Sequence, residues 1–279
     1  MKQISILGCG WLGFPLAKSL LKKGYSINGS TTTLEKIPVL EHAGIVPFSI
    51  QLSEDKIDGE IDSFLKNSEI LIIDIPPKLR GDSSETSTGL SKTLVRKIQN
   101  LIPFIEKSLV KKVIFVSSTS VYTDENAKLT EESIPNPDTE SGKQLVEAEQ
   151  LLQSNAKFET AVIRFGGLIG SDRHPIKFLS GKTNIENPDA PINLIHQEDC
   201  IGIIEKILRE AQTENFSWDE TFNAVAPFHP TRKEYYTQKA IEFNLPLPHF
   251  NESKPSIGKL IQCEKVERVL GYSFKNIKL

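Results

Sequence analysis

The pattern that most constrains this chain lies in its first 24 residues. A short apolar run at residues 4–7 (I-S-I-L) is typical of a strand buried on both faces. Three glycines follow at G-x-G-x-x-G spacing: Gly8, Gly10 and Gly13. Leucines then recur at helical spacing until Gly24. The order of strand, glycine turn and helix predicts the first unit of a dinucleotide-binding fold.

Each glycine of the turn has its own predicted role. Unpaired N–H groups and the positive dipole end at the start of a helix attract a pyrophosphate. Gly8 permits the tight turn, Gly10 leaves no Cβ between backbone and phosphate, and Gly13 lets the helix pack on the strand. We expect Leu12 to contact the cofactor as well. Trp11 either lines the nicotinamide side of the cleft or packs in the core.

Composition excludes several classes of function. The chain has 279 residues and a net charge of −3, without a basic block, so we expect neither nucleic acid nor membrane as its partner. The apolar runs have strand length, and the N-terminus leads directly into the first strand, so we predict no membrane span and no signal peptide. Three cysteines without metal-type spacing indicate reduced thiols and a cytoplasmic protein without a metal.

Strands and helices alternate through the first 170 residues. We predict strands at residues 25–30, 45–50, 69–75, 112–117 and 159–164. Helices are predicted at residues 34–43, 57–66, about 90–107 and 139–155, with a Ser/Thr/Gly loop at 81–89. Since parallel strands need crossover connections, this alternation predicts an α/β fold of the Rossmann type, with a doubly wound parallel sheet.

The alternation loosens after Gly170. We predict helices at residues 199–209, 233–243 and 256–270, and a short strand near 221–224 that returns to the sheet. The predicted organisation is a dinucleotide-binding domain at 1–170 and a smaller substrate-binding lobe at 171–279. The lobe is expected over the carboxyl ends of the strands, where such sheets bind ligands.

The end of the second strand indicates which nicotinamide cofactor binds. About 20 residues after the glycines, a carboxylate would hold the ribose 2′-OH and repel a 2′-phosphate. Residues 30–33 are hydroxyl side chains instead, including Thr31 and Thr32, and Lys36 follows them. These groups favour NADP(H) over NAD(H). We also expect Pro76 and Ser117, at the ends of the fourth and fifth strands, to contact the cofactor.

Four further motifs resemble one enzyme family, in the family's order. V-S-S-T-S-V-Y at residues 116–122 resembles the end of the fifth strand in the extended short-chain dehydrogenase/reductases, the NAD-dependent epimerase/dehydratase family. S-G-K-Q-L-V-E at 141–147 is similar to the family's active-site helix. R-F-G-G-L-I-G at 164–170 and N-L-I-H-Q-E-D at 193–199 resemble its sixth strand and its late I-H-x-x-D segment. The closest resemblance is to the atypical members of this family.

The resemblance implies a catalytic set, and the chain departs from it at one position. In the family a Ser or Thr, a Tyr and a Lys act together, and the lysine lowers the pKa of the tyrosine, which removes a hydroxyl proton. Ser118 matches the first and Lys143 the last, where it also binds the cofactor ribose. Thr139 stands where the tyrosine belongs. A threonine hydroxyl has neither the pKa nor the reach of a phenol, so the acid/base is not identified.

Other candidates have simpler interpretations. The chain's one Y-x-x-x-K, Tyr235 with Lys239, is interpreted as a surface pair on a polar helix. Tyr122 is expected to pack at the strand end. His196 and Asp199 are interpreted as a helix start, and Arg164 and Arg173 as either contacts to an anionic substrate or members of ion pairs.

Three functional hypotheses remain open. The first is an NADP(H)- or NAD(H)-dependent oxidoreductase or epimerase acting on a small hydroxyl, carbonyl or sugar-type substrate. The second is a non-catalytic dinucleotide-binding sensor. The third follows from residues 8–17, which also resemble the opening of 3-hydroxyacid dehydrogenases; those continue into an all-helical half. The family resemblance also implies a homodimer through the helices at about 90–107 and 139–155.

Overall fold

A parallel β-sheet forms the centre of the molecule. The computed structural model describes residues 2–77, 93–210 and 216–279 of the chain. Seven strands form this sheet through parallel pairings. In spatial order they are β12 (Thr221–Ala224), β9 (Glu159–Phe165), β7 (Lys112–Ser118), β6 (Ser68–Ile73), β1 (Gln3–Leu7), β2 (Ser26–Thr31) and β3 (Val46–Ser49). The predicted Rossmann-type α/β fold is confirmed.

The strand order reverses between the neighbours β1 and β6. From β1 the chain proceeds outward to β2 and β3, and from β6 it proceeds in the other direction to β7, β9 and β12. The carboxyl ends of the seven strands share one edge because the pairings are parallel. The reversal is the position where open α/β sheets bind their ligands, and the glycine turn lies directly after β1.

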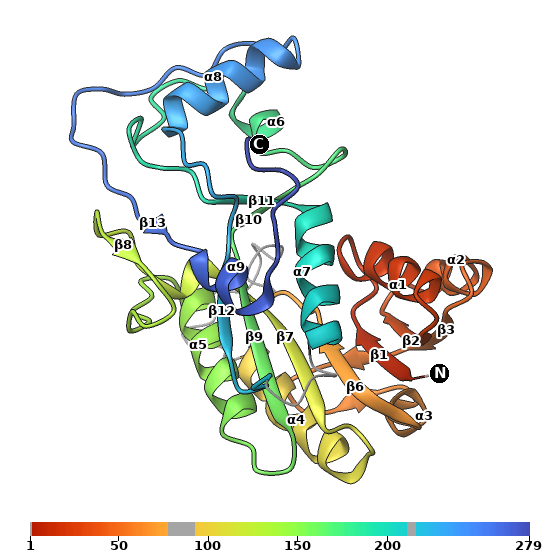
Figure 1. Ribbon diagram of the computed structural model, residues 1–279. Coiled ribbons are helices and arrows are strands. Elements are labelled where there is room, and N and C mark those ends of the chain that lie inside the picture. Colours follow the sequence, from red (N-terminus) through yellow and green to blue (C-terminus); the bar gives the residue numbers. More distant parts are fainter. Residues whose placement is uncertain (1, 78–92, 211–215) are drawn as a thin grey trace.

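Helices cover both faces of the sheet. α4 (Thr93–Lys107) and α5 (Glu140–Gln153) pack against each other on one face, and α1 (Gly13–Lys22) and α7 (Gln197–Glu210) lie on the other (Figure 1). A 3-10 turn, η1 (Leu34–Lys36), leads into the short α2 (Ile37–His42), and α3 (Ile61–Leu65) precedes β6. The central strands are enclosed by these layers, so most of their side chains are buried on both faces.

A smaller lobe stands over the carboxyl edge of the sheet (Figure 1). There β10 (Gly167–Ile169) pairs with β11 (Leu194–His196), and α6 (Ile176–Leu179) packs on α8 (Arg232–Glu242). The lobe has an apolar cluster of its own: Ile169, Ile176, Ile192, Leu194, Tyr235, Tyr236 and Ala240. The strands of the second half exclude the all-helical half of the 3-hydroxyacid dehydrogenases. The division at residue 170 remains a prediction.

Two predicted helices are only partly helical. At residues 57–66 the chain first forms β5 (Ile57–Asp58), which pairs antiparallel with β4 (Gln51–Leu52), and only α3 is helical. Gly59 separates them at φ +109°, where an added Cβ would lie 2.1 Å from the Ser49 carbonyl oxygen. The apolar spacing of so short a segment fits a helix and a strand equally well, and the pairing with β4 makes its first residues a strand.

The second is the helix predicted at residues 256–270, which is wrong over most of its length. β13 (Leu260–Ile261) pairs with β8 (Lys128–Leu129), and only α9 (Glu264–Leu270) is helical. Gly258 packs so closely that an added Cβ would lie 2.7 Å from the Ala190 Cβ. Tertiary contacts therefore hold the first half of this segment in a non-helical conformation, although its local apolar spacing favoured a helix.

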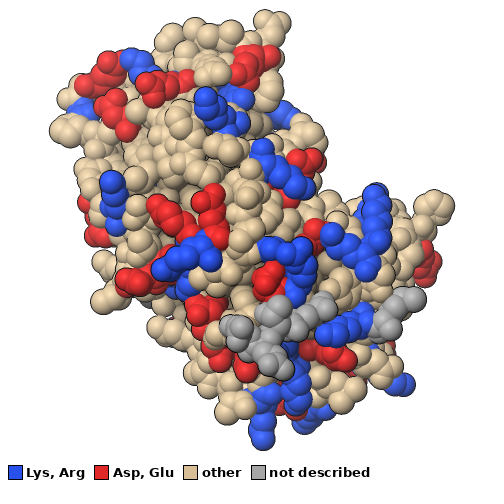
Figure 2. Space-filling model, viewed as in Figure 1, with Lys and Arg blue, Asp and Glu red and all other residues tan. Residues whose placement is uncertain are grey.

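The remaining predicted elements agree within a few residues. The predicted loop at 81–89 and the first residues of the helix from about 90 lie outside the described residues. None of the helices in the described ranges combines the length and the apolar character that crossing a bilayer requires. Acidic and basic side chains are interspersed on the face shown in Figure 2.

Candidate dinucleotide site

The three glycines meet three different surroundings. An added Cβ on Gly8, which has φ +109°, would lie 2.2 Å from the Asp74 carbonyl oxygen. An added Cβ on Gly13 would lie 2.2 Å from the Gly8 carbonyl oxygen. No atom lies within 4 Å of an added Cβ on Gly10. Gly8 and Gly13 are therefore required by the turn itself, whereas Gly10 leaves free space above the backbone.

A cleft of about 680 Å³ opens beside the glycine turn at the carboxyl edge of the sheet. Its walls come from the turn, from the ends of β2, β3 and β6, and from the start of α4. Leu12, the N-cap of α1, provides no capping side chain. The Gly13 N–H donates to the Asp74 carboxyl, and the Phe14 N–H donates to the Gly10 carbonyl oxygen at 3.2 Å. The volume lies within the range of roughly 300–1,000 Å³ that small-molecule sites occupy.

The end of β2 lines this cleft, and its hydroxyls already have partners. Ser30 Oγ accepts from the Gly8 N–H at 2.9 Å, which fixes the turn against β2. Thr31 is buried, and its Oγ1 accepts from the Thr33 N–H at 3.1 Å. Thr32 and Lys36 are exposed on the cleft wall. Of the predicted phosphate-binding groups, Thr32, Thr33 and Lys36 are thus the accessible ones.

The other predicted cofactor residues lie in different positions. Pro76 lines the cleft directly after β6. The Leu12 side chain is buried, so only its backbone can reach a ligand. Trp11 is half-buried; its indole N–H donates to Asp172 Oδ1 at 2.9 Å, and the Arg173 guanidinium lies 5.1 Å from its ring centroid. Trp11 therefore ties the glycine turn to the loop after β10.

Asp74 is one of the titratable groups of the cleft that sequence reasoning missed. It follows β6 directly and lines the cleft beside the glycine turn. Burial raises the pKa of the Asp74 carboxyl to about 7, against a hydrogen bond from the Gly13 backbone that lowers it. Its position at the end of a buried strand that neighbours β1 was the signal that could have identified it.

The predicted catalytic residues lie on two adjacent elements. Ser118 ends β7, and its Oγ accepts from the Ser120 N–H at 3.2 Å at the start of η2 (Thr119–Val121). The start of α5 packs on η2. Thr139 is the N-cap of α5, since its Oγ1 accepts from the Gly142 N–H at 3.1 Å. Lys143 is exposed one turn further along α5.

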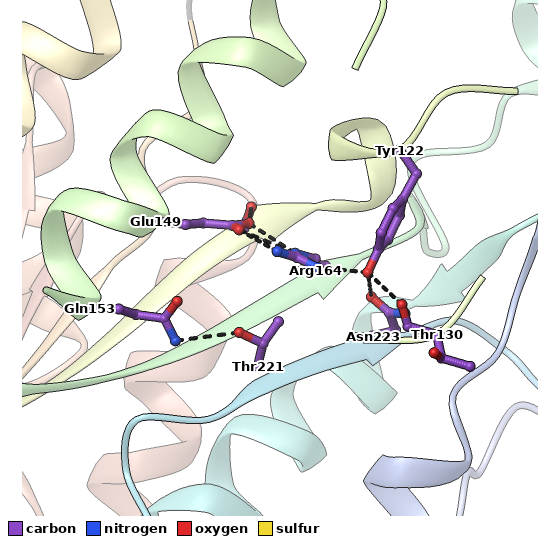
Figure 3. Close-up of polar contacts among 8 residues, drawn as sticks. Tyr122, Thr130, Glu149, Gln153, Arg164, Thr221 and Asn223 are labelled. Atoms are coloured by element: carbon purple, nitrogen blue, oxygen red, sulfur yellow. Dashed lines mark hydrogen bonds and ion pairs between the residues drawn. The ribbon is translucent and has the colours of Figure 1, made fainter. Parts of the chain in front are cut away.

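Tyr122 packs at the strand end, as expected, within a buried polar network (Figure 3). Its hydroxyl accepts from Arg164 Nη1 at 2.6 Å and lies 3.1 Å from Asn223 Oδ1. Arg164 Nη2 also donates to Glu149 Oε2 at 2.6 Å. Ser117 is buried and donates its hydroxyl to the same carboxylate at 2.5 Å. Arg164 therefore belongs to an ion pair inside the molecule.

The interpretation of Tyr235 as a surface residue is wrong. Tyr235 is buried in the lobe, and its hydroxyl lies 2.9 Å from His174 Nε2. The helix composition is polar, but α8 turns this side chain onto α6. Lys239 pairs with Glu242 at 2.7 Å, and its ammonium group also lies 5.8 Å from the Tyr235 ring centroid.

Asp199 lies in the first turn of α7, as expected for a helix start, and has a second function. It is fully buried, and its carboxylate accepts from the Tyr272 hydroxyl at 2.8 Å and the Lys275 N–H at 2.7 Å. It therefore fixes the C-terminal segment to the start of α7. The neighbouring His196 is half-buried and accepts from the Glu198 N–H at 3.3 Å.

Comparisons with known proteins agree with this fold. A scan against models of protein families gives no match. Protein YeeZ of Escherichia coli (strain K12) is 31% identical over 277 residues, which are 99% of this chain and 96% of that protein.

Two solved structures resemble the chain over nearly its whole length. A putative NAD-dependent epimerase/dehydratase from Methylobacillus flagellatus is 21% identical, with a TM-score of 0.75 over 99% of this chain and 94% of that one. UDP-glucuronic acid 4-epimerase from Bacillus cereus, in complex with UDP-glucuronic acid and NAD, is 17% identical, with a TM-score of 0.79 over 98% and 94%. At these identities the likeness establishes the fold.

Proposed function

The chain belongs to the family of Protein YeeZ, and from this premise we propose that it binds a nicotinamide dinucleotide on its glycine turn and acts as an oxidoreductase or epimerase. The single observation that carries the proposal is the free space above Gly10, beside a cleft at the reversal of the strand order. Because Gly8 and Gly13 serve the turn itself, only Gly10 remains to be explained by a ligand.

The described residues fit such a dinucleotide. The glycine turn and the positive dipole end of α1 would bind its diphosphate, and the cleft wall at residues 30–36 would hold the adenosine ribose. Lys143 would bind the nicotinamide ribose, as the family resemblance implies. Bound there, the nicotinamide would accept or return a hydride.

We favour NADP(H) over NAD(H) within this proposal. Lys36 and Thr32 are exposed on the wall of the cleft, where a cation and a hydroxyl can bind a 2′-phosphate. The solved neighbour from Bacillus cereus carries NAD, which supports the dinucleotide and does not decide its phosphorylation.

The substrate proposed is a small molecule with a hydroxyl or carbonyl group, such as a sugar derivative. The UDP-glucuronic acid in the Bacillus cereus neighbour supports a sugar-type substrate. Ser118 and Lys143 lie on adjacent elements at the carboxyl edge, where Ser118 could orient a substrate oxygen and Lys143 the ribose.

A specific observation also favours the second candidate, a non-catalytic dinucleotide sensor. The Thr139 hydroxyl caps α5 and the Ser118 hydroxyl caps η2, so both polar groups at the family's catalytic positions serve the backbone. Turnover separates the two candidates. An enzyme would interconvert NADP⁺ and NADPH with a hydroxyl or carbonyl substrate, and Lys143→Met would abolish this turnover; a sensor would bind the dinucleotide without turnover.

The first experiment is a titration of the purified protein with NADPH and NADH, followed by nicotinamide fluorescence. We expect micromolar binding of NADPH and weaker binding of NADH. Gly10→Val places a branched side chain in the free space, so it should abolish binding and leave the thermal unfolding midpoint unchanged. Retained NADPH affinity in Gly10→Val would contradict the proposal.

Gly13→Val is the matched contrast for this variant. Its Cβ would lie 2.2 Å from the Gly8 carbonyl oxygen, so this variant should lower the free energy of unfolding by about 1–3 kcal/mol.

Lys36→Gln tests the cofactor preference: NADPH affinity should fall to that of NADH, while NADH affinity stays unchanged. Equal losses for both would show that Lys36 does not distinguish them.

We also propose a homodimer through α4 and α5, as the resemblance implies. These helices pack side by side on one face of the sheet, which would give a four-helix interface around a two-fold axis. Light scattering at micromolar concentration should give twice the chain mass of 31.2 kDa; a monomer at that concentration would contradict the proposal.

A further inference from the structure

Asp74 lies at the beginning of α1, where a diphosphate is expected. Its N–H donates to the Leu7 carbonyl oxygen at 2.9 Å, which continues the ladder between β1 and β6. Its Oδ2 lies 3.2 Å from the position of an added Cβ on Gly13. The carboxyl group is therefore fixed between the glycine turn and the first residue of α1, and it faces the cleft.

The titratable groups around Asp74 do not compensate its charge, and the hydrogen bond from the Gly13 N–H is the contact that favours the ionised carboxyl. Cys9 from the glycine turn and Cys200 from α7 are buried. Burial and the charge of Asp74 raise the pKa of the Cys9 thiol to about 12, and burial with the charges of Asp199 and Asp74 raises that of Cys200. Both therefore stay neutral at physiological pH. The positive charge of Lys36 acts on the Cys9 thiol and opposes the rise of its pKa. None of the cations in the described part of the chain forms an ion pair with Asp74.

The remaining charged groups lie elsewhere on the cleft wall. Glu54, the other carboxylate of the cleft, lies 3.4 Å from Arg96 and accepts from the Thr93 hydroxyl at 2.6 Å. Lys97 of α4 also lines the cleft. The charge on Asp74 thus depends mainly on its own burial, which brings its titration close to pH 7.

We propose that Asp74 is a binding residue of the dinucleotide site and that it takes part as the neutral acid, donating its proton to a phosphate oxygen. The inference rests on the proposed function. An ionised carboxylate at this place would repel the diphosphate in a poorly solvated site, and it would keep the hydrogen bond from the Gly13 N–H at the start of α1. The neutral acid is instead a hydrogen-bond donor.

Proton uptake upon binding is the consequence of this arrangement. When a dinucleotide binds to a protein molecule in which Asp74 is ionised, Asp74 must take up one proton from solution. Affinity should therefore fall as the pH rises through 7, and the fall should depend on Asp74 alone.

The test is a titration with NADH between pH 6 and 9, because the NADH diphosphate does not itself titrate in this range. With a free pKa of about 7, we expect binding about tenfold weaker at pH 8 than at pH 6, and a further loss of about tenfold by pH 9. Asp74→Asn keeps a neutral donor of the same shape, so its affinity should match the wild type at pH 6 and stay constant. Glu54→Gln is the matched control and should keep the wild-type pH dependence.

Calorimetry in buffers with different heats of ionisation measures the proton directly. At pH 8 the wild type should take up close to one proton per NADH, and Asp74→Asn none. An NADH affinity that is independent of pH, without proton uptake, would overturn the role of Asp74 and leave the proposed function intact. Absence of NADH binding at every pH would overturn the proposed function as well.

A measurement on the ligand-free wild type keeps the inference testable should Asp74→Asn not fold. The ¹³C carboxyl resonance of Asp74, followed by NMR, should titrate with a midpoint near pH 7. A midpoint below about 5, close to that of an ordinary aspartate, would overturn the proposal.

Discussion

At the scale of single residues, His174 shows how burial changes a titratable side chain. It is 6% exposed in the apolar cluster of the lobe. Its Nδ1 accepts from the Ile176 N–H at 3.1 Å, which assigns the proton to Nε2, 2.9 Å from the Tyr235 hydroxyl. Burial, with the charges of Lys239 and Lys177, lowers the pKa of His174 to about 4. The lobe core is therefore built around a neutral imidazole.

This shift predicts an acid-dependent stability of the lobe. The unfolded chain binds a proton at His174 near pH 6.5 and the folded chain only near pH 4, so stability falls as the pH falls between these values. His174→Asn keeps an acceptor for the Ile176 N–H but cannot titrate. The free energy of unfolding of the wild type should decrease relative to this variant by up to about 1.4 kcal/mol per pH unit.

Urea unfolding of both proteins at pH 4, 5 and 7 measures the difference. The exposed His249 provides the matched control variant, His249→Asn. Parallel stability profiles for the wild type and His174→Asn would contradict the prediction.

At the scale of elements, threonine caps define the start of two helices. Thr139 caps α5 through the Gly142 N–H. Thr231 caps α8 in a capping box, in which Glu234 also accepts from the Thr231 N–H at 3.1 Å. Each satisfies an N–H group that the helix itself cannot pair. Thr139 therefore has a structural role at the start of α5.

The cap predicts the cost of substitution at Thr139. Thr139→Ala should lower the free energy of unfolding by about 1 kcal/mol, and Thr231→Ala by a similar amount as the matched control. Thr139→Ser preserves the cap and should restore the stability. Chemical denaturation of the three variants measures this; equal stabilities of Thr139→Ala and the wild type would show that the cap contributes nothing.

At the scale of the whole molecule, a buried polar network joins α5 to three strands of the sheet (Figure 3). Glu149 of α5 binds Ser117 at the end of β7 and Arg164 of β9. Arg164 binds Tyr122, whose hydroxyl reaches Asn223 of β12 and the Thr130 carbonyl oxygen at 2.9 Å. Each member depends on the others, since a buried charge without its partner is unfavourable.

The network predicts unequal effects of single and double substitutions. Arg164→Met alone leaves Glu149 buried without a cation and should cost about 3–5 kcal/mol. Replacing both Arg164 and Glu149 by Met should recover a large part of that loss, because no unpaired charge remains. Gln153→Met is the matched control on the same helix: it removes a hydrogen bond of 3.3 Å to Thr221 and should cost less than about 1.5 kcal/mol.

A double-mutant cycle from urea unfolding measures the coupling between Arg164 and Glu149. Additive losses in the double variant would contradict the coupling and show that the two side chains act independently.

The local pattern of apolar residues identified the strands and helices that alternate regularly along the chain. The central strands are apolar and the helices between them have helical spacing, so the parallel sheet followed from periodicity and from the need for crossovers. The short strands β4, β5, β8 and β13 were not predicted, because two residues carry no period. Tyr235 was misplaced for a related reason: a polar helix composition does not reveal which single side chain faces a neighbouring helix.

The sequence by itself determined the glycine turn, the order of the elements and the positions of Ser118, Thr139 and Lys143. These depend on spacing along the chain, which local sterics convert directly into structure. Only the tertiary structure decided that Gly10 has free space while Gly13 has none, that Asp74 faces the start of α1, and that Arg164 pairs with Glu149. Such facts depend on burial and on distances between residues far apart in the chain, and no local pattern encodes them.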